Sequence, residues 1–322
     1  MSLLMDVRDL RVRYAMPRTA LFAKRIGLEA VRGVSFAIER GQALGIVGES
    51  GSGKTTAAMA SIRLTKAEGG EVLFEGDDLL QLDAAAMRQR RRDIQLIFQD
   101  PYSSLNPRSR VADIVREPLD LMGIGPPAER VERVQELFAL VGLRQDQLNL
   151  FPHQFSGGQR QRVSIARALA TKPMLLVCDE PVSALDVAIQ AQILNLLAEL
   201  KGQQGLSYLF ISHDLGVVRH ICDEVAVMYL GKIVESGPTA ELFRQPRHPY
   251  TQAILAAAPS LTRRRSRGNV RPLKIAGDPP SPIDPPAGCA FTDRCPKAME
   301  RCRLEAPARV ADGSRTLACH FP

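Results

Sequence analysis

A glycine-rich segment near residue 50 has the residue types of a polyphosphate site. It reads GESGSGKT over residues 48–55, with Lys54 and Thr55 directly after its last glycine. Glycines let backbone N–H groups approach a polyphosphate, because a Cβ would obstruct them, and a helix beginning near Gly53 adds its positive end. We predict that Lys54 reaches the β- and γ-phosphates of a nucleoside triphosphate and that the Thr55 hydroxyl ligates Mg²⁺. A glycine-rich surface turn is the alternative, and the apolar strand directly before the loop argues against it.

An acidic pair supplies a second part of the same chemistry. The segment PMLLVCDE (173–180) ends in Asp179 and Glu180, at the carboxyl end of an apolar run. Open α/β sheets bind their ligands at this end of the strands. We predict that Asp179 holds Mg²⁺ through water and that Glu180 orients and deprotonates an attacking water. A solvated acidic loop fits the pair equally well when taken alone, and the glycine loop upstream is what favours hydrolysis.

A second glycine turn lies between these two motifs. Ser156, Gly157 and Gly158 in FSGGQRQR (155–162) precede the helical pattern RQRVSIARALAT. A helix start of this kind can receive an anion, yet one triphosphate does not require two such sites in one fold. By itself, the pentapeptide is better explained as a turn that caps an ordinary helix.

Short apolar runs must position these motifs. ALGIVG (43–48), PMLLVCDE (173–180) and SYLFISH (207–213) have the length of strands and are apolar throughout. Such runs suit strands buried on both faces of a mainly parallel sheet, and their brevity argues against buried helices. ERVERVQELFALV (129–141) has the spacing of an amphipathic helix.

Composition excludes several classes of protein. The 322 residues are 45% apolar and 24% charged, enough for a sizeable core and about two domains. Six basic residues and no acidic one fall between Arg263 and Lys274, which accounts for most of the net charge of +7. A broad nucleic-acid surface is therefore not expected, and a solvated linker is favoured over contact with anionic lipid or an acidic loop of a membrane partner. No run reaches the roughly 18 apolar residues of a membrane span, and the start lacks a signal peptide, so we expect a cytoplasmic protein.

Proline and cysteine mark the C-terminal part. Thirteen of the 22 prolines follow Gly237, so we place one domain at 1–240 and a smaller extension at 241–322. Four cysteines lie in the last 34 residues, with five, six and sixteen residues between them. That spacing suits neither a paired CxxC zinc site nor a compact ferredoxin run, and it leaves an iron–sulfur cluster, zinc and unligated thiols open.

The order of the motifs resembles the ATP-binding cassette (ABC) ATPases: GESGSGKT, then FSGGQRQR, then PMLLVCDE. The resemblance implies an α/β P-loop NTPase cassette, in which a RecA-like core carries antiparallel β and α-helical subdomains. It also implies a dimer in which the signature FSGGQ of one subunit closes on ATP held by the phosphate loop of the other. The signature begins with Phe155 where leucine is usual, a conservative change. The implied nucleotide contacts are Tyr14, Gly48, Ser50, Gly51, Gly53, Lys54, Thr55, Thr56, Ser156, Gly157, Gly158, Gln159 and Asp186.

Four further positions match the family individually. Gln99 in IFQDP resembles the loop glutamine that touches Mg²⁺ or the attacking water, and Asp186 in SALD resembles the acidic residue of a loop that communicates across the dimer. His213 resembles the switch histidine that contacts the γ-phosphate, and Tyr14 is the candidate for stacking on adenine. The resemblance thus implies two sets of functional residues. The catalytic set is Glu180, His213 and Gln99, and the Mg²⁺ set is Thr55, Gln99 and Asp179.

The C-terminal extension resembles one branch of this family. ELFRQPRHPYTQAILAAAPS (241–260), with its His248-Pro249-Tyr250, resembles the extension of the oligopeptide/dipeptide importer branch. That branch often carries a four-cysteine motif, so the resemblance implies a [4Fe–4S] cluster of structural character. The four ligands would be Cys289, Cys295, Cys302 and Cys319. His320, beside the last of them, keeps a cysteine–histidine zinc site open.

The resemblance also implies partners. It predicts an ATPase subunit of an importer for dipeptides or oligopeptides, peripheral to the cytoplasmic face of the inner membrane. Its partners would be two membrane permeases, an extracytoplasmic binding protein, and a second homologous ATPase or a second copy of this chain. A nickel or glutathione importer is the alternative within transport. A soluble ABC protein that acts on ribosomes or DNA is the alternative from another class, but such proteins usually show tandem cassettes or coiled-coil insertions.

Overall fold

The structure is a computed structural model that describes residues 2–15, 27–257, 277 and 280–321. The chain divides into two compact units, each built from separate stretches. The first unit comprises Met1–Leu3, Ile38–Ala43 and Gln81–Ile211, and the second comprises Leu4–Ala37, Leu44–Leu80 and Ser212–Pro322. The arginine-rich segment 263–274 lies outside the described residues. The domain boundary near residue 240 is placed from the sequence alone, and it stays a prediction.

The first unit contains three parallel strands of an eight-stranded sheet. They are β6 (Ile94–Ile97), β7 (Leu175–Asp179) and β8 (Ser207–Ser212), and β7 pairs with both neighbours in parallel register. Every residue of β7 and β8 is buried, as the continuous apolar runs predict for strands covered on both faces. The carboxyl ends of these strands therefore lie at one edge of the sheet, where Asp179 ends β7.

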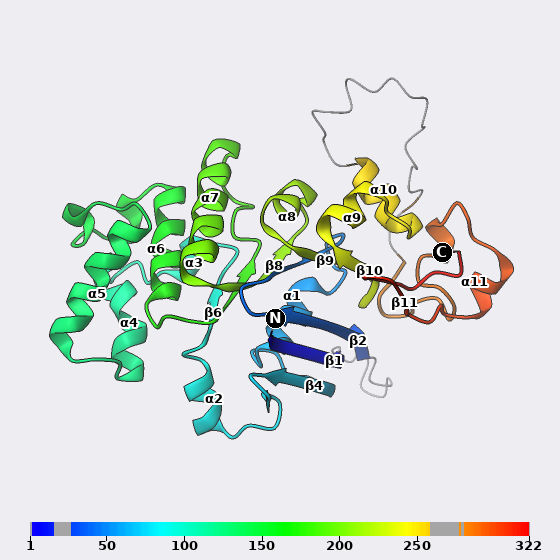
Figure 1. Cartoon of the computed structure of the whole chain (residues 1–322), viewed down its shortest axis with the longest axis horizontal. Coiled ribbons are helices and arrows are strands. Elements are labelled where there is room, and N and C mark those ends of the chain that lie inside the picture. Colours follow the sequence, from blue (N-terminus) through cyan, green and yellow to red (C-terminus); the bar gives the residue numbers. More distant parts are fainter. Residues whose placement is uncertain (1, 16–26, 258–276, 278–279, 322) are drawn as a thin grey trace, which may run out of the picture. The chain divides into compact units, whose positions relative to one another are not determined.

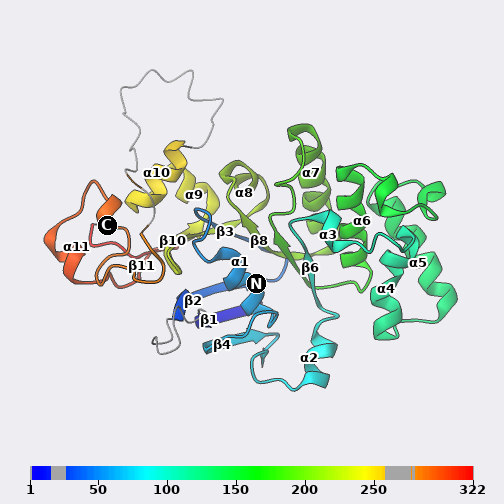
Figure 2. The ribbon, with the colours of Figure 1, turned by 180° about the vertical axis from the view of Figure 1, so that it is seen from behind.

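Helices make up the rest of the first unit. They are α2 (Ala84–Arg90), α3 (Pro101–Ser104), α4 (Val111–Met122), α5 (Pro127–Leu140), α6 (Gly157–Leu169), α7 (Val187–Gln204) and the short η1 (Gln145–Gln147) and η2 (Pro152–Gln154). α6 packs against α3, α4, α5 and α7, and this group of helices is seen from both sides in Figures 1 and 2. The predicted amphipathic helix at 129–141 is confirmed as α5, which buries Val134, Leu137 and Phe138 on one face.

The second unit contains an antiparallel sheet and the other five strands of the eight-stranded sheet. The antiparallel one has the strand order β2-β1-β4-β5, and Figure 1 labels β1, β2 and β4. Its strands are β1 (Leu3–Ala15), β2 (Gly27–Glu39), β4 (Gly69–Phe74) and β5 (Asp77–Asp78). β1 pairs with β4 in the register Met5↔Phe74, and both of those side chains are fully buried.

The part of the eight-stranded sheet in this unit carries the glycine loop. Its strand order is β11-β12-β10-β9-β3, with β3 parallel to β9 and the remaining pairs antiparallel. The bounds are β3 (Ala43–Val47), β9 (Glu224–Tyr229), β10 (Lys232–Pro238), β11 (Val310–Asp312) and β12 (Arg315–Leu317). The helices are α1 (Lys54–Ser61), α8 (Leu215–Ile221), α9 (Thr239–Arg244), α10 (Pro249–Ala257), η4 (Thr292–Arg294) and α11 (Glu300–Leu304). Strands β11 and β12 belong to the C-terminal extension, and β12 pairs with β10, so the extension adds two strands to this sheet.

Within the described part of the chain, no helix combines the length and the apolar character that crossing a bilayer requires.

Candidate nucleotide-binding site

The glycine loop connects a buried strand to a helix, as its sequence predicts. β3 is buried throughout and ends at Val47, and α1 begins at Lys54. Gly53 caps α1 with φ 99°, and a Cβ there would lie 2.3 Å from the carbonyl oxygen of Ala30. A Cβ at Gly48 would lie 2.2 Å from the carbonyl oxygen of Met228. Glycine is therefore required at both ends of the loop by the approach of neighbouring backbone.

Lys54 is held at the base of the loop. Its side chain is buried, and its Nζ donates to the carbonyl oxygens of Gly48 and Glu49, both at 2.9 Å. No acidic residue occupies the first turn of α1, so the positive end of the helix keeps its attraction for an anion. Ser50, Gly51 and Thr55 are exposed, whereas Thr56 is half-buried. The loop thus offers N–H groups, a cation and a hydroxyl in one short segment.

The acidic pair and Gln99 come together in the first unit. Asp179, 6% exposed, ends β7, and the next residue, Glu180, adopts a left-handed φ of 46°. That conformation costs about 1–2 kcal/mol for a residue other than glycine. It is held by the Glu180 N–H, which donates to the Ile211 carbonyl at 3.0 Å. The Glu180 carboxylate accepts a hydrogen bond from Gln99 Nε2 at 2.9 Å. A carboxylate and an amide therefore meet beside the end of a buried strand.

The signature forms a capped helix start. Ser156 is the N-cap of α6: its Oγ accepts from the Gln159 N–H at 3.3 Å, and Gln159 Oε1 accepts from the Ser156 N–H at 3.0 Å. A Cβ at Gly158 would lie 2.4 Å from Ile189 Cγ2, so this glycine allows α6 to pack closely against α7. No acidic side chain occupies the first turn of α6. The turn therefore caps a helix and also keeps a start that can receive an anion.

Three other predicted residues lie at ends of elements. Asp186 caps α7, where its carboxylate accepts from the Ile189 N–H at 3.0 Å. His213 directly follows β8 and is exposed. Tyr14 is 41% exposed and lines a cavity of about 550 Å³ with Arg13, Lys66 and Glu68 among its walls. The first unit thus carries Gln99, Asp179, Glu180, the signature and Asp186, and the second carries the loop, His213 and Tyr14.

The four C-terminal cysteines gather in the second unit as free thiols. Cys302 is buried, and Cys289, Cys295 and Cys319 are half-buried. Burial raises the pKa of Cys289 to about 11, and its three sulfur neighbours add smaller contributions in the same direction. Among the described residues, however, no group of three or more Cys, His, Asp or Glu side chains is arranged to hold a metal ion. The predicted [4Fe–4S] cluster therefore has no support in the geometry.

The zinc alternative gains no support either. His320 Nε2 lies 2.9 Å from the carbonyl oxygen of Glu305, so this ring nitrogen already has a backbone partner. The cysteine-rich segment is instead built from the short helices η4 and α11 and the strand pair β11–β12.

Comparison with known proteins identifies the family. The profile described as ABC transporter matches residues 31–183, and the one described as oligopeptide/dipeptide transporter, C-terminal region, matches residues 234–302. The chain is 48% identical to the oligopeptide transport ATP-binding protein AppF of Bacillus subtilis, over 99% of this chain and 97% of that protein. It is 46% identical to the dipeptide transport ATP-binding protein DppF of Escherichia coli, over 98% of this chain and 93% of that protein. The chain belongs to the oligopeptide/dipeptide branch of the ABC transporter ATP-binding proteins.

Solved structures agree with this assignment. The ATP-binding cassette MJ0796, determined as a dimer in a post-hydrolysis state with ADP and Pi, is 29% identical with a TM-score of 0.65 and covers 73% of this chain and 99% of its own. The cbiO1 protein of Clostridium perfringens, part of the transporter complex cbiONQ, is 26% identical with a TM-score of 0.65 and covers 76% of this chain and 92% of its own. The predicted ABC cassette and ATPase activity are confirmed. The role of each site residue stays a prediction.

Contacts of this ABC ATPase that sequence reasoning missed centre on Glu49. The phosphate-loop pattern allows any residue at this position, so the motif gives it no role. In the structure, its carboxylate accepts from both terminal nitrogens of Arg294, at 2.8 and 3.0 Å. Its N–H donates to Tyr250 Oη at 2.8 Å. Two features of the sequence point to these contacts: the segment His248-Pro249-Tyr250, and Arg294 between two of the cysteines.

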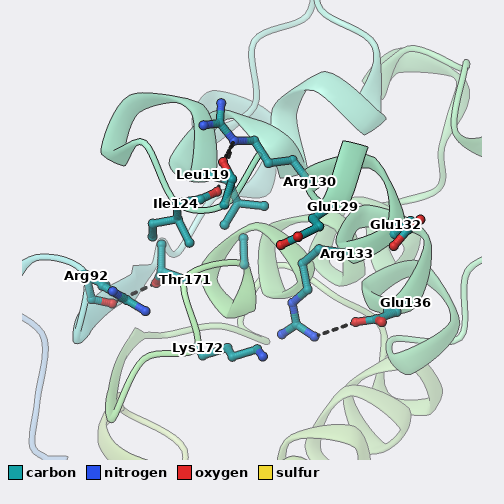
Figure 3. A pocket seen from close by; sticks show the side chains of 12 residues that line it. Arg92, Leu119, Ile124, Glu129, Arg130, Glu132, Arg133, Glu136, Thr171 and Lys172 are labelled. Atoms are coloured by element: carbon teal, nitrogen blue, oxygen red, sulfur yellow. Dashed lines mark hydrogen bonds and ion pairs between the residues drawn. The ribbon is translucent and has the colours of Figure 1, made fainter. Parts of the chain in front are cut away.

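A separate pocket lies among the helices of the first unit. It has a volume of about 300 Å³, and its lining combines apolar side chains, such as Leu119 and Ile124, with charged ones. In Figure 3, Arg130 turns toward the carbonyl oxygen of Ile124, and Arg133 pairs with Glu136 at 3.1 Å. None of the predicted nucleotide contacts is among its described lining residues. This pocket is therefore separate from the residues that are predicted to contact the nucleotide.

Proposed function

We propose that this ATPase drives a peptide importer, by hydrolysing Mg-ATP at a dimer interface and coupling hydrolysis to uptake through separate membrane permeases. The observation that carries the catalytic part is the Glu180 carboxylate, which is held by Gln99 at 2.9 Å directly after the buried strand β7. The peptide substrate is proposed from the two relatives, whose names assign them to oligopeptide and dipeptide transport.

The residues have distinct chemical roles in this proposal. Glu180 accepts a proton from water while the water oxygen bonds to the γ-phosphorus. The bond from that phosphorus to the β,γ-bridging oxygen breaks, its electron pair remains on ADP, and phosphate is released. Lys54 balances the negative charge of the phosphates, and His213 contacts the γ-phosphate. Gln99 orients the Glu180 carboxylate through the hydrogen bond between their side chains.

Magnesium fits the chemistry of the predicted donors. Mg²⁺ prefers oxygen ligands, and the chain offers the exposed Thr55 hydroxyl in the first turn of α1 and the Asp179 carboxylate at the end of β7. These residues, with the side chain of Gln99, would hold the ion. When bound, it neutralises charge on the β- and γ-phosphates.

Dimerisation follows from the signature. One cassette that binds one triphosphate does not use two anion-receptive helix starts, and both α1 and α6 have first turns without acidic residues. We propose that Ser156, Gly157 and Gly158 close on ATP held by the loop of a facing cassette, with Asp186 communicating across the interface. The solved relative MJ0796 is itself described as dimeric. The facing cassette is a second copy of this chain or a homologous ATPase.

The remaining partners complete an importer. We propose two permeases, an extracytoplasmic substrate-binding protein, and a peripheral position of this subunit at the cytoplasmic face of the inner membrane. A structural [4Fe–4S] cluster on the four C-terminal cysteines is a separate proposal, which the present arrangement of the sulfurs does not support. Iron and acid-labile sulfide in protein purified anaerobically would establish it, and a metal-free, fully folded protein would refute it.

Transport is the decisive test. A strain lacking this gene should lose uptake of labelled dipeptides and oligopeptides and regain it with the wild-type chain, but not with the Glu180→Gln variant. Uptake of nickel or glutathione instead of peptides would refute the substrate. Co-purification with ribosomes or DNA, and not with permeases, would refute transport altogether.

A further inference from the structure

Glu49 places a carboxylate inside the loop that binds polyphosphate. It is the second residue of GESGSGKT, and its backbone carbonyl accepts from Lys54 Nζ at 2.9 Å. A negative charge in such a loop opposes the binding of a triphosphate, because like charges at short range repel strongly. An unpaired Glu49 would therefore weaken the site in which it lies.

Arg294 compensates the negative charge of Glu49. Its Nη1 and Nη2 donate to the two carboxylate oxygens of Glu49 at 2.8 and 3.0 Å, which is the bidentate geometry of a strong charge-assisted pair. The Arg294 side chain is 8% exposed and that of Glu49 is 29% exposed, so water screens the pair less than an ordinary surface ion pair. The two residues are 245 positions apart, and Arg294 lies in the cysteine-rich segment of the extension.

Aromatic side chains hold the arginine in place. Tyr229 Oη accepts from Arg294 Nη1 at 3.3 Å, and the Tyr229 ring lies against those of Tyr250 and Phe291, with centroids at 4.7 and 5.3 Å. All three rings are at most 1% exposed. Tyr250 also accepts from the Glu49 N–H at 2.8 Å, so the extension fixes both the carboxylate and the backbone of this residue. A rigid support of this kind limits the orientations that the guanidinium can take.

We propose that Arg294 is a positioning residue for the phosphate loop: it neutralises Glu49 and, with Tyr250, fixes the loop in the form that receives the triphosphate. The inference rests on the proposed function, since it concerns the same ATP site. It gives the C-terminal extension a direct part in nucleotide affinity. Arg294 acts through Glu49, without touching the nucleotide.

Charge variants test this role in the full-length chain. The chain contains no tryptophan, so binding of a fluorescent ATP analogue is measured without tryptophan emission. We expect Arg294→Gln to weaken Mg-ATP binding about tenfold, because Glu49 then repels the phosphates. Glu49→Gln should bind as well as wild type or more tightly. The double variant Glu49→Gln/Arg294→Gln should recover to within about threefold of wild type, because the uncompensated charge is gone.

A purely structural role of the Glu49–Arg294 pair predicts a different pattern. Removing both partners would then not restore the Mg-ATP affinity that is lost when Arg294 alone is removed. A double variant that binds as weakly as Arg294→Gln would overturn the proposal, as would an Arg294→Gln chain that binds like wild type. The matched control is Arg301→Ala, which breaks an exposed pair with Glu305 in the same extension and should leave affinity unchanged. Melting without nucleotide identifies an unfolded variant. If Arg294→Gln does not fold, Arg294→Lys is tested in its place. We expect Arg294→Lys to weaken Mg-ATP binding and the added Glu49→Gln substitution to restore it. Binding of Mg-ATP by Arg294→Lys as tight as in wild type would contradict the proposal. Absence of ATP binding by the wild-type chain would instead refute the proposed function.

Discussion

Glu235 is the buried carboxylate on which the extension depends. It lies in β10, is 1% exposed, and pairs with Arg315 of β12, whose side chain is 9% exposed. The same carboxylate accepts from the backbone N–H groups of Arg247 and His248, each at 3.0 Å. One side chain thus joins a central strand, the terminal strand pair and the backbone just before Pro249. Replacing it by alanine removes all of these bonds at once.

The cost of Glu235→Ala follows from these contacts. Removing one partner of a buried ion pair costs about 3–5 kcal/mol, because the other charge stays buried without compensation. Two backbone N–H groups also lose their acceptor, which adds to the loss. We expect at least about 3 kcal/mol less free energy of unfolding. At about 2–4 °C per kcal/mol, the melting temperature should fall by roughly 6–12 °C. Glu235→Gln keeps an acceptor oxygen but loses the charge, so its effect should be smaller.

Denaturant melts and calorimetry of the nucleotide-free chain measure the effect. Arg301→Ala is the matched control, because its pair with Glu305 is exposed and should contribute less than about 1 kcal/mol. If Glu235→Ala cost no more than this control, the carboxylate would not be the link between β10, β12 and the backbone before Pro249. The reasoning from burial would then be wrong.

Three further predictions test other parts of the chain. Glu180→Gln should keep Mg-ATP binding and lower kcat at least about a hundredfold, as loss of a general base does, and steady-state hydrolysis at the wild-type rate would contradict its role. Gly158→Ala should lose about 1–3 kcal/mol in chemical melts, because its Cβ would lie 2.4 Å from Ile189, whereas Gly157→Ala, with 3.4 Å to its nearest neighbour, should lose clearly less. Burial lowers the pKa of His248 to about 4 in the folded chain. Between about pH 6.5 and pH 4 the unfolded chain therefore binds a proton at this residue that the folded chain does not, and the free energy of unfolding should decline as the pH falls through this range. Melts of His248→Gln across this range should lack that part of the decline, and an identical pH profile would show that His248 is not its source.

Local sequence patterns predicted the parts of the site that depend on neighbouring residues. The apolar runs became β3, β7 and β8 because strands buried on both faces need no polar alternation. Gly53 could be placed before α1 because the transition from strand to helix requires the left-handed backbone that glycine adopts most easily. The capped start of α6 could be placed in the same way, since Ser156 and Gln159 are three residues apart and satisfy each other's backbone N–H groups.

Local sequence patterns could not predict contacts between residues that are far apart in the chain. Two 13-residue strands, β1 and β2, are neighbours in the antiparallel sheet, and no short sequence motif predicted them. The pairing of β10 with β12 joins Glu235 to a segment about 80 residues later, a separation that no local sequence pattern covers. The cysteines differ again, because only the family resemblance implied a four-cysteine ligand set, and the described residues contain no group arranged to hold a metal ion.

Buried and half-buried carboxylates connect the extension to the residues before it. A carboxylate such as Glu49 or Glu235 needs a cation placed by the fold, and here both cations, Arg294 and Arg315, come from residues after 240. Removing those residues would leave one carboxylate uncompensated in a phosphate-binding loop and another in a sheet, at a cost far above that of losing surface pairs. The apolar face of Tyr229 would lose its cover at the same time. The extension therefore supplies counter-charges and packing that the preceding residues already require, through Arg294 beside the loop and Arg315 beside β10.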